Sequence, residues 1–74
     1  MEEGMDFSEA LQLVKCGSSI QRAGWNGKGM FVYLYKPEGD GTYLPFLMMK
    51  TADDKFVPWL ASQTDILAED WSVI

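Results

Sequence analysis

The segment Gly24-Trp25-Asn26-Gly27-Lys28-Gly29 combines the residue types of a ligand-binding turn. Trp25 offers a flat aromatic face to a base or other ring, and Asn26 offers both a hydrogen-bond donor and an acceptor. Gly27 and the flanking glycines permit positive φ and close approach of the backbone to a ligand. Lys28 adds a positive charge to an acidic chain. We therefore expect an exposed turn that binds a ring-containing ligand.

A plain β-hairpin turn is the alternative explanation for the same residues. Asn26-Gly27 is the dipeptide most typical of a two-residue type I′ turn. Such a turn does not require Trp25 or the additional Gly29. Both interpretations can hold together.

A second polar cluster follows Trp59 and consists of four hydrogen-bonding side chains in succession: Ser62, Gln63, Thr64 and Asp65. They lie at the predicted start of a short helix, where free N–H groups favour an anion. Capping by Ser62 and Asp65 is the simpler explanation, although it leaves Gln63 and Thr64 unexplained. Trp59, like Trp71, is expected to be a core or interface residue.

The sequence gives little support to catalysis. It contains no His, and its single Cys16 has no neighbouring group to activate a thiolate, so we expect a small buried residue there. The absence of Cys pairs and of His argues against a metal site, and no cofactor is predicted. Most carboxylates fall in loops and at helix ends and are interpreted as solvated charges: Asp40, Asp53, Asp54, Asp65, Glu69 and Asp70. The prediction is a binding protein and not an enzyme.

Length and charge narrow the possibilities further. The 74 residues predict one small domain over 1–74, with a net charge of −5 that argues against general binding of DNA or RNA. An anionic ligand must therefore be held locally, by backbone N–H groups and by one or two cations such as Lys28 and Arg22. No apolar run approaches the roughly 20 residues needed to span a bilayer, so no membrane is expected. The acidic N-terminus and the single Cys favour the cytoplasm.

The pattern of elements predicts an α+β fold, in which an N-terminal helix packs on a small antiparallel sheet. Asp6 and Glu9 can form a capping box, and Gly17 is a natural left-handed stop for the helix. Its apolar face carries Phe7, Ala10, Leu11 and Val14. Strands are expected over residues 18–24, 30–35, 44–50, 56–60 and 71–74, with a short helical turn from Ser62 to about Glu69 before the last strand. Residues 51–55 are expected to form a hairpin loop, and Pro58 places its strand at an edge or a bulge.

Both faces of two predicted strands are apolar. Met30, Val32 and Leu34 alternate with Phe31, Tyr33 and Tyr35, and residues 44–49 repeat the pattern. A one-sided antiparallel sheet would alternate apolar with polar residues. Since one helix covers only one face, the second face must line a pocket or meet another subunit, and we expect a homo-oligomer.

Several of these segments together resemble the Thoeris anti-defence family, type two, of small phage proteins. The resemblance covers residues 5–74 and rests on five motifs in order: Phe7-Ser8-Glu9-Ala10-Leu11, Gly24-Trp25-Asn26-Gly27-Lys28-Gly29-Met30, Met49-Lys50-Thr51-Ala52-Asp53, Val57-Pro58-Trp59-Leu60-Ala61-Ser62-Gln63-Thr64-Asp65 and Leu67-Ala68-Glu69-Asp70-Trp71. The connection over residues 36–43 is short for the family. If it borders the pocket, ligand preference differs here.

The resemblance implies a sponge that binds cyclic ADP-ribose isomers made by bacterial TIR enzymes, glycocyclic ADP-ribose among them, and keeps them from the Thoeris effector. It also implies a homotetramer with ligand sites at subunit interfaces, in the host bacterial cytoplasm, and in some relatives a separate site for CBASS cyclic oligonucleotides. The expected ligand-binding residues are Arg22, Trp25, Asn26, Gly27, Lys28, Ser62, Gln63, Thr64 and Asp65. The alternatives are an enzyme that degrades the same signal, an acidic protein–protein inhibitor and a structural subunit of a virion.

Overall fold

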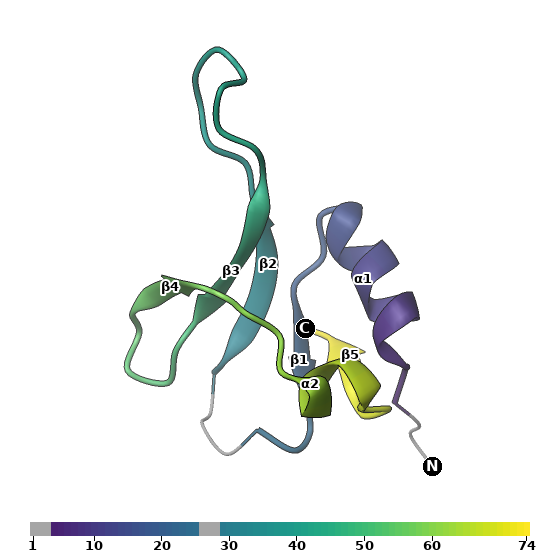
Figure 1. Cartoon of the computed structure of the whole chain (residues 1–74). Coiled ribbons are helices and arrows are strands. Elements are labelled where there is room, and N and C mark those ends of the chain that lie inside the picture. The colour runs from purple at the N-terminus through teal and green to yellow at the C-terminus, as the bar shows by residue number, and fades with distance from the viewer. Residues whose placement is uncertain (1–3, 26–28) are drawn as a thin grey trace.

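The structure, a computed structural model, describes residues 4–25 and 29–74 and confirms the α+β fold (Figure 1). Two helices and five strands follow one another as α1 (Phe7–Lys15), β1 (Ile20–Arg22), β2 (Phe31–Tyr35), β3 (Phe46–Lys50), β4 (Phe56–Pro58), α2 (Gln63–Leu67) and β5 (Trp71–Val73). The expected strands are all present, though each is shorter than predicted.

Both helices begin with the capping box that the sequence predicts. At α1, the Glu9 N–H donates to the Asp6 carboxylate over 3.0 Å, and the Asp6 N–H donates back to Glu9 over 3.3 Å. Ser62 and Asp65 form the same reciprocal pair at α2. Gly17 follows α1 with a φ of 109°, a left-handed conformation that glycine adopts without steric cost. These local signals fix where each helix starts and where α1 stops.

The five strands form one antiparallel sheet in the order β4-β3-β2-β1-β5. Pro58 lies in the edge strand β4, as predicted, where its missing N–H costs no ladder hydrogen bond. The closing strand β5 pairs with β1 at the other end of the sheet, which sets Arg22 opposite Trp71. Met5 bridges to the free side of Trp71. The residues around Trp71 are therefore held by segments from both ends of the chain.

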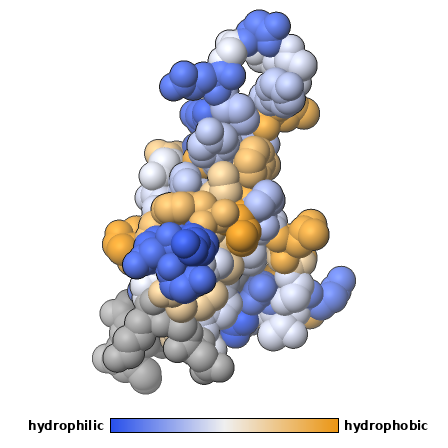
Figure 2. Space-filling model, turned by 90° about the vertical axis from the view of Figure 1, so that its left-hand side faces the viewer, coloured by the Kyte–Doolittle hydropathy of each residue, from blue (hydrophilic) through white to orange (hydrophobic). Residues whose placement is uncertain are grey.

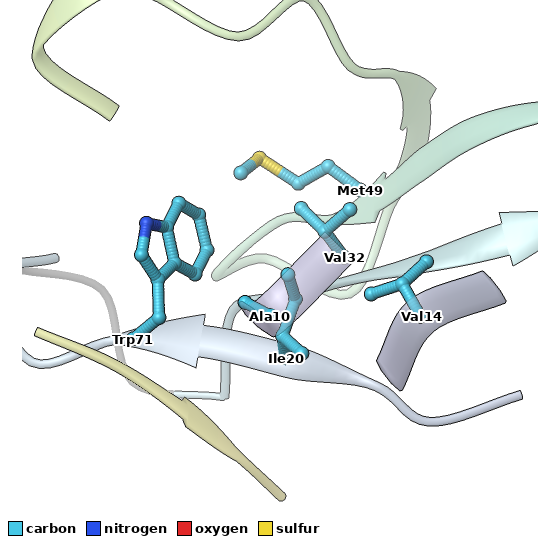
Figure 3. Close-up of a cluster of buried hydrophobic side chains, with 6 residues drawn as sticks. All are labelled: Ala10, Val14, Ile20, Val32, Met49 and Trp71. Carbon is cyan, nitrogen blue, oxygen red and sulfur yellow. The ribbon is translucent and has the colours of Figure 1, made fainter. Parts of the chain in front are cut away.

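The core lies between α1 and one face of the sheet (Figure 3). Its buried side chains are Ala10, Val14, Ile20, Val32, Met49 and Trp71. Ala10 and Val14 stand one turn apart on α1, while Ile20, Val32 and Met49 lie in register across three strands. This core is small, because a chain of this length buries only about 60% of its unfolded surface.

The opposite face of the sheet is aromatic, and we call it the aromatic face. The strand register places on it Phe31, Tyr33, Tyr35, Phe46, Met48 and Phe56. Rings pair along it, with centroids 6.0 Å apart for Phe31 and Tyr33 and 6.3 Å apart for Tyr33 and Phe56. Among the described residues, α1 and α2 both pack on the core side. The prediction that both faces of β2 and β3 are apolar is confirmed.

The molecule is elongated, with extents of 45 × 26 × 22 Å, because the β2–β3 hairpin projects from the rest (Figure 1). Figure 2 shows apolar residues gathered in the middle of the molecule, below the largely hydrophilic tip of this hairpin. Near the tip, Tyr43 and Leu44 are 73% and 78% exposed. The surface area is 5380 Å², whereas a typical monomer of this mass exposes about 4,600 Å².

The expectation that Cys16 is buried is wrong, because its thiol is exposed. The buried stripe of α1 runs through Ala10 and Val14. At about 100° per residue, Cys16 lies roughly 200° around the helix from Val14 and so faces away from the core.

Candidate ligand-binding site

The two polar clusters singled out in the sequence meet in space. Trp25 follows the end of β1, and Asp65 lies in the first turn of α2. The indole Nε1–H of Trp25 donates to the Asp65 carboxylate over 3.3 Å. The ring and the polar start of α2 therefore belong to one cluster.

Arg22 is the centre of this cluster. Its Nη1 lies 2.8 Å from Asp65 Oδ1, and its Nε lies 2.8 Å from Asp70 Oδ1. The side chains of Arg22 and Asp65 are each 15% exposed, so the pair is largely screened from water. Since β1 pairs with β5, Arg22 stands opposite Trp71 and beside Asp70, which explains the geometry.

The cluster carries a net negative charge, because one guanidinium faces two carboxylates. The hydrogen bond from Arg22 is the main reason that the pKa of Asp70 lies below its ordinary value, and the Gly24 N–H adds to it. Burial raises the pKa of Asp65, but hydrogen bonds from Arg22, Trp25 and Ser62 outweigh it and the net shift is downward. Hydrogen bonds to Asp70 and then Asp65 raise the pKa of Arg22. All three groups are charged at neutral pH.

Four aromatic rings pack beside these charges. Trp25 meets Trp71 nearly edge-on, with centroids 5.3 Å apart, and meets Trp59 at 6.4 Å. Phe7 of α1 lies 5.3 Å from Trp71 and 6.1 Å from Trp59. Trp71 is fully buried and Trp59 partly buried, as expected of core residues. Trp25 is half-buried and not fully exposed, because its ring packs on this cluster.

The remaining residues of the second cluster divide into two kinds. Ser62 caps α2, and its hydroxyl accepts the Asp65 N–H over 3.0 Å. Gln63 and Thr64 occupy the exposed first turn of the helix. Capping therefore accounts for Ser62, while Gln63 and Thr64 keep exposed side chains at the start of α2.

The predicted residues Asn26, Gly27 and Lys28 lie outside the described residues. The chain is described again from Gly29, whose carbonyl accepts a hydrogen bond from Lys50 Nζ over 3.2 Å. Lys50 also pairs with Asp54 at 2.6 Å. Lys50 thus places its ammonium group beside Gly29. The residues next to Lys50 in the sequence do not predict this contact.

Asp70 is the other residue that sequence reasoning missed, since it was interpreted as a solvated charge. It precedes the buried Trp71, and its partner Arg22 lies 48 residues away, so only knowledge of the β1–β5 pairing could reveal the contact. Among residues 4–25 and 29–74, no three His, Cys, Asp or Glu side chains lie close enough to hold a metal ion. What the cluster offers is an aromatic edge, carboxylate acceptors and two exposed polar side chains.

Comparison with known proteins decides the family. The model of the Thoeris anti-defense 2-like domain matches residues 5–74. The chain is also 40% identical to Thoeris anti-defense 2 of Bacillus phage SP01, over the whole of this chain and 99% of that relative. The chain belongs to the Thoeris anti-defense 2-like family. The alignment with this family member runs over 88 positions against 74 residues here, so the phage SP01 protein has additional residues.

Membership of this family supports a phage anti-defence function. The resemblance seen in the sequence is thereby confirmed over residues 5–74. No helix in the described part of this Thoeris anti-defense 2-like chain is long and apolar enough to cross a membrane.

Proposed function

We propose that this protein sequesters a cyclic ADP-ribose-type signalling nucleotide made by bacterial TIR enzymes and so keeps the Thoeris effector inactive. The observation that carries the proposal is the junction of Trp25 with Asp65, which unites an aromatic ring with the polar start of α2. Family membership supplies the biological context. The ligand would bind at the surface where Trp25, Gln63 and Thr64 reach solvent.

The charges of the cluster favour one orientation of such a ligand. Asp65 and Asp70 are ionised, and Asp65 can accept a hydrogen bond from a ribose hydroxyl or an adenine amino group. The two carboxylates repel a pyrophosphate. Arg22 cannot offset this repulsion, because both carboxylates already engage its guanidinium. We therefore propose that the pyrophosphate binds away from Arg22, near the glycine-rich segment that contains Lys28.

Binding without turnover fits the chemistry of the described residues. Asp65 and Asp70 have lowered pKa values, so they are poor proton donors near pH 7, and both are tied to Arg22. The exposed thiol of Cys16 has no His partner in the chain. A degrading enzyme is the alternative function, and an acidic inhibitor is a weaker one, because the acidic residues are scattered along the sequence.

The decisive experiment incubates the protein with glycocyclic ADP-ribose and EDTA, denatures it by heat, and analyses the released nucleotide by chromatography. Quantitative recovery of unaltered nucleotide, with saturable binding in calorimetry, is the expected result. A cleaved product in excess over protein would establish the degrading enzyme instead. A CBASS cyclic oligonucleotide titrated in parallel tests for a second ligand class.

We further propose that the chain assembles with itself, as a homotetramer, with the aromatic face at an interface between copies. The described helices leave this face uncovered, and the chain exposes more surface than a typical monomer of its mass. Tyr35, Phe46 and Phe56 on this face are 40%, 37% and 55% exposed. Burial of such aromatic side chains is the usual source of stability in an obligate interface.

A further inference from the structure

The carboxylate of Asp70 reinforces the pairing of β1 with β5 and extends it past the end of β1. Its Oδ1 accepts from Arg22 Nε over 2.8 Å, and its Oδ2 accepts the Gly24 N–H over 2.8 Å. The Asp70 carbonyl also accepts the Ala23 N–H over 3.1 Å. One residue therefore binds the chain at three successive positions just where β1 ends and the Trp25 segment begins.

Arg22 links Asp70 to Trp25 through a second carboxylate, that of Asp65. The guanidinium holds Asp70 with Nε and Asp65 with Nη1, so its position depends on both carboxylates. The same Oδ1 of Asp65 that receives Arg22 Nη1 also receives the Trp25 indole N–H. Contacts thus run without a gap from Asp70 through Arg22 and Asp65 to the ring of Trp25.

The backbone around Asp70 leaves little room for movement. A Cβ added at Gly4 would stand 2.5 Å from both Asp70 Cα and Glu69 O, so the N-terminal segment lies directly against it. Met5 and Trp71 exchange two backbone hydrogen bonds of 2.8 and 3.2 Å. The backbone around Asp70 is therefore held both by β1 and by the N-terminal segment, which limits the positions open to its carboxylate.

We propose that Asp70 is a positioning residue, which fixes the orientation of the Trp25 ring through Gly24 and Arg22 without touching the ligand. A ring that is already ordered loses little entropy on binding, and this slows release of the ligand. The claim that Asp70 slows release of the ligand rests on the proposed sequestration of a cyclic nucleotide. The claim that Asp70 orients the Trp25 ring is independent of it.

The test compares Asp70→Asn with Glu69→Gln, which removes one negative charge from the exposed neighbour. Hydrogen exchange of the indole N–H groups is followed by NMR, and the Trp25 signal is assigned from its loss in Trp25→Phe. In Asp70→Asn we expect exchange of the Trp25 indole to accelerate about tenfold, the lower range for loss of a hydrogen bond to a charged group. The Trp71 indole, which donates to the Asp65 carbonyl over 3.0 Å, should change by less than about twofold.

The second readout is dissociation of glycocyclic ADP-ribose, measured by stopped flow. We expect a rate about tenfold higher in Asp70→Asn, an unchanged rate in Glu69→Gln, and partial rescue in Asp70→Glu. A folded Asp70→Asn protein with wild-type indole exchange or wild-type dissociation overturns the proposal. If the wild-type protein binds no cyclic nucleotide, the proposed function fails, and the exchange measurement alone decides the role of Asp70.

Gly24→Ala provides a second variant in case Asp70→Asn does not fold. The added Cβ would stand 3.0 Å from Arg22 Nη2 and 3.1 Å from Asp70 Oδ2, so the two side chains must shift by a few tenths of an ångström while every charge is kept. Gly24 is absent from the positions with positive φ, so alanine is tolerated by the backbone there. The same acceleration of Trp25 exchange is expected, and normal exchange in this variant contradicts the proposal.

Discussion

Trp25 and Asp65 are separated by 40 residues in the chain, yet the indole N–H of one donates to the carboxylate of the other over 3.3 Å. The contact makes the ring of Trp25 part of an ordered cluster instead of a free side chain on a turn. Its burial on Trp71 means that substitutions of Trp25 act on stability as well as on binding.

Trp25→Ala should weaken binding of glycocyclic ADP-ribose by about 1–3 kcal/mol, the range for losing one base–aromatic stacking contact. We also expect the unfolding free energy to fall by about 1–3 kcal/mol, less than for a fully buried Trp. Calorimetry and urea denaturation measure the two effects. Tyr43→Ala, at a residue that is 73% exposed on the projecting hairpin, is the control and should change neither. Unchanged affinity in a folded Trp25→Ala protein would remove Trp25 from the site.

Ser62→Ala and Gln63→Ala should separate capping from ligand binding. Ser62→Ala removes the hydroxyl that accepts the Asp65 N–H, and we expect it to cost about 1 kcal/mol of stability. Gln63→Ala and Thr64→Ala should alter stability by less than about 0.5 kcal/mol, as is usual for exposed positions, but weaken ligand binding. Thermal unfolding and calorimetry of the three variants test this. If Gln63→Ala and Thr64→Ala both bind as tightly as the wild type, neither side chain contacts the ligand.

Acid should destabilise the fold through Asp65 and Asp70. Their pKa values are lower in the folded protein, so their stabilisation is complete above the unfolded pKa and is lost as pH falls through the folded values. We expect a nearly constant unfolding free energy from pH 7 to about 5 and a decline below about pH 4. Chemical denaturation at a series of pH values measures it.

Asp70→Asn supplies the control for this pH dependence. Asp6 and Asp40 also have lowered pKa values, through hydrogen bonds from Glu9 and Thr42 respectively, and both remain in the variant. The difference between the two curves therefore isolates Asp70 and its coupling to Arg22. A decline below pH 4 as steep in the variant as in the wild type would show that Asp70 contributes nothing to acid sensitivity.

Charged substitutions on the aromatic face should dissociate the proposed homotetramer. Tyr33→Glu and Phe56→Glu would each place a carboxylate in the interface, where burial of an unpaired charge is strongly unfavourable. Analytical ultracentrifugation at micromolar concentration should show smaller species for both variants. Leu13→Glu, at a residue 36% exposed on α1, applies the same change on the other side of the sheet and should leave the mass unchanged. A wild-type protein that sediments as an 8.4 kDa monomer would rule out the assembly.

Features governed by neighbours in sequence could be predicted from the chain alone. The capping boxes of Asp6 with Glu9 and Ser62 with Asp65 each span three residues, and both are present. The edge position of Pro58 follows from its missing N–H. Alternation along β2 and β3 assigned their residues to the correct faces, because side chains in a strand repeat with a period of two.

Features that depend on strand pairing could not be predicted in this way. The pairing of β1 with β5 brings Arg22 to Asp70. Arg22 was expected to be available for an anionic ligand, but its charge is neutralised by this contact. The same pairing gives Asp70 its partners. Cys16 was misplaced for a different reason, since burial was inferred from its chemistry and not from its angle around α1. The positions of Asn26, Gly27 and Lys28 stay predictions.

The order of the sheet has a kinetic consequence. The β2–β3 hairpin can form from neighbouring residues and β1 can pair with β2, whereas β5, the last of the seven elements in the chain, must pair with β1 near the start. Closing so long a loop is slow, because its entropy is lost before the contacts that reward it are made. Arg22, Asp65 and Asp70 can come together only at that final step. An early folding intermediate that already contains the hairpin would therefore have no binding activity, and the protein would acquire it abruptly when the sheet is completed.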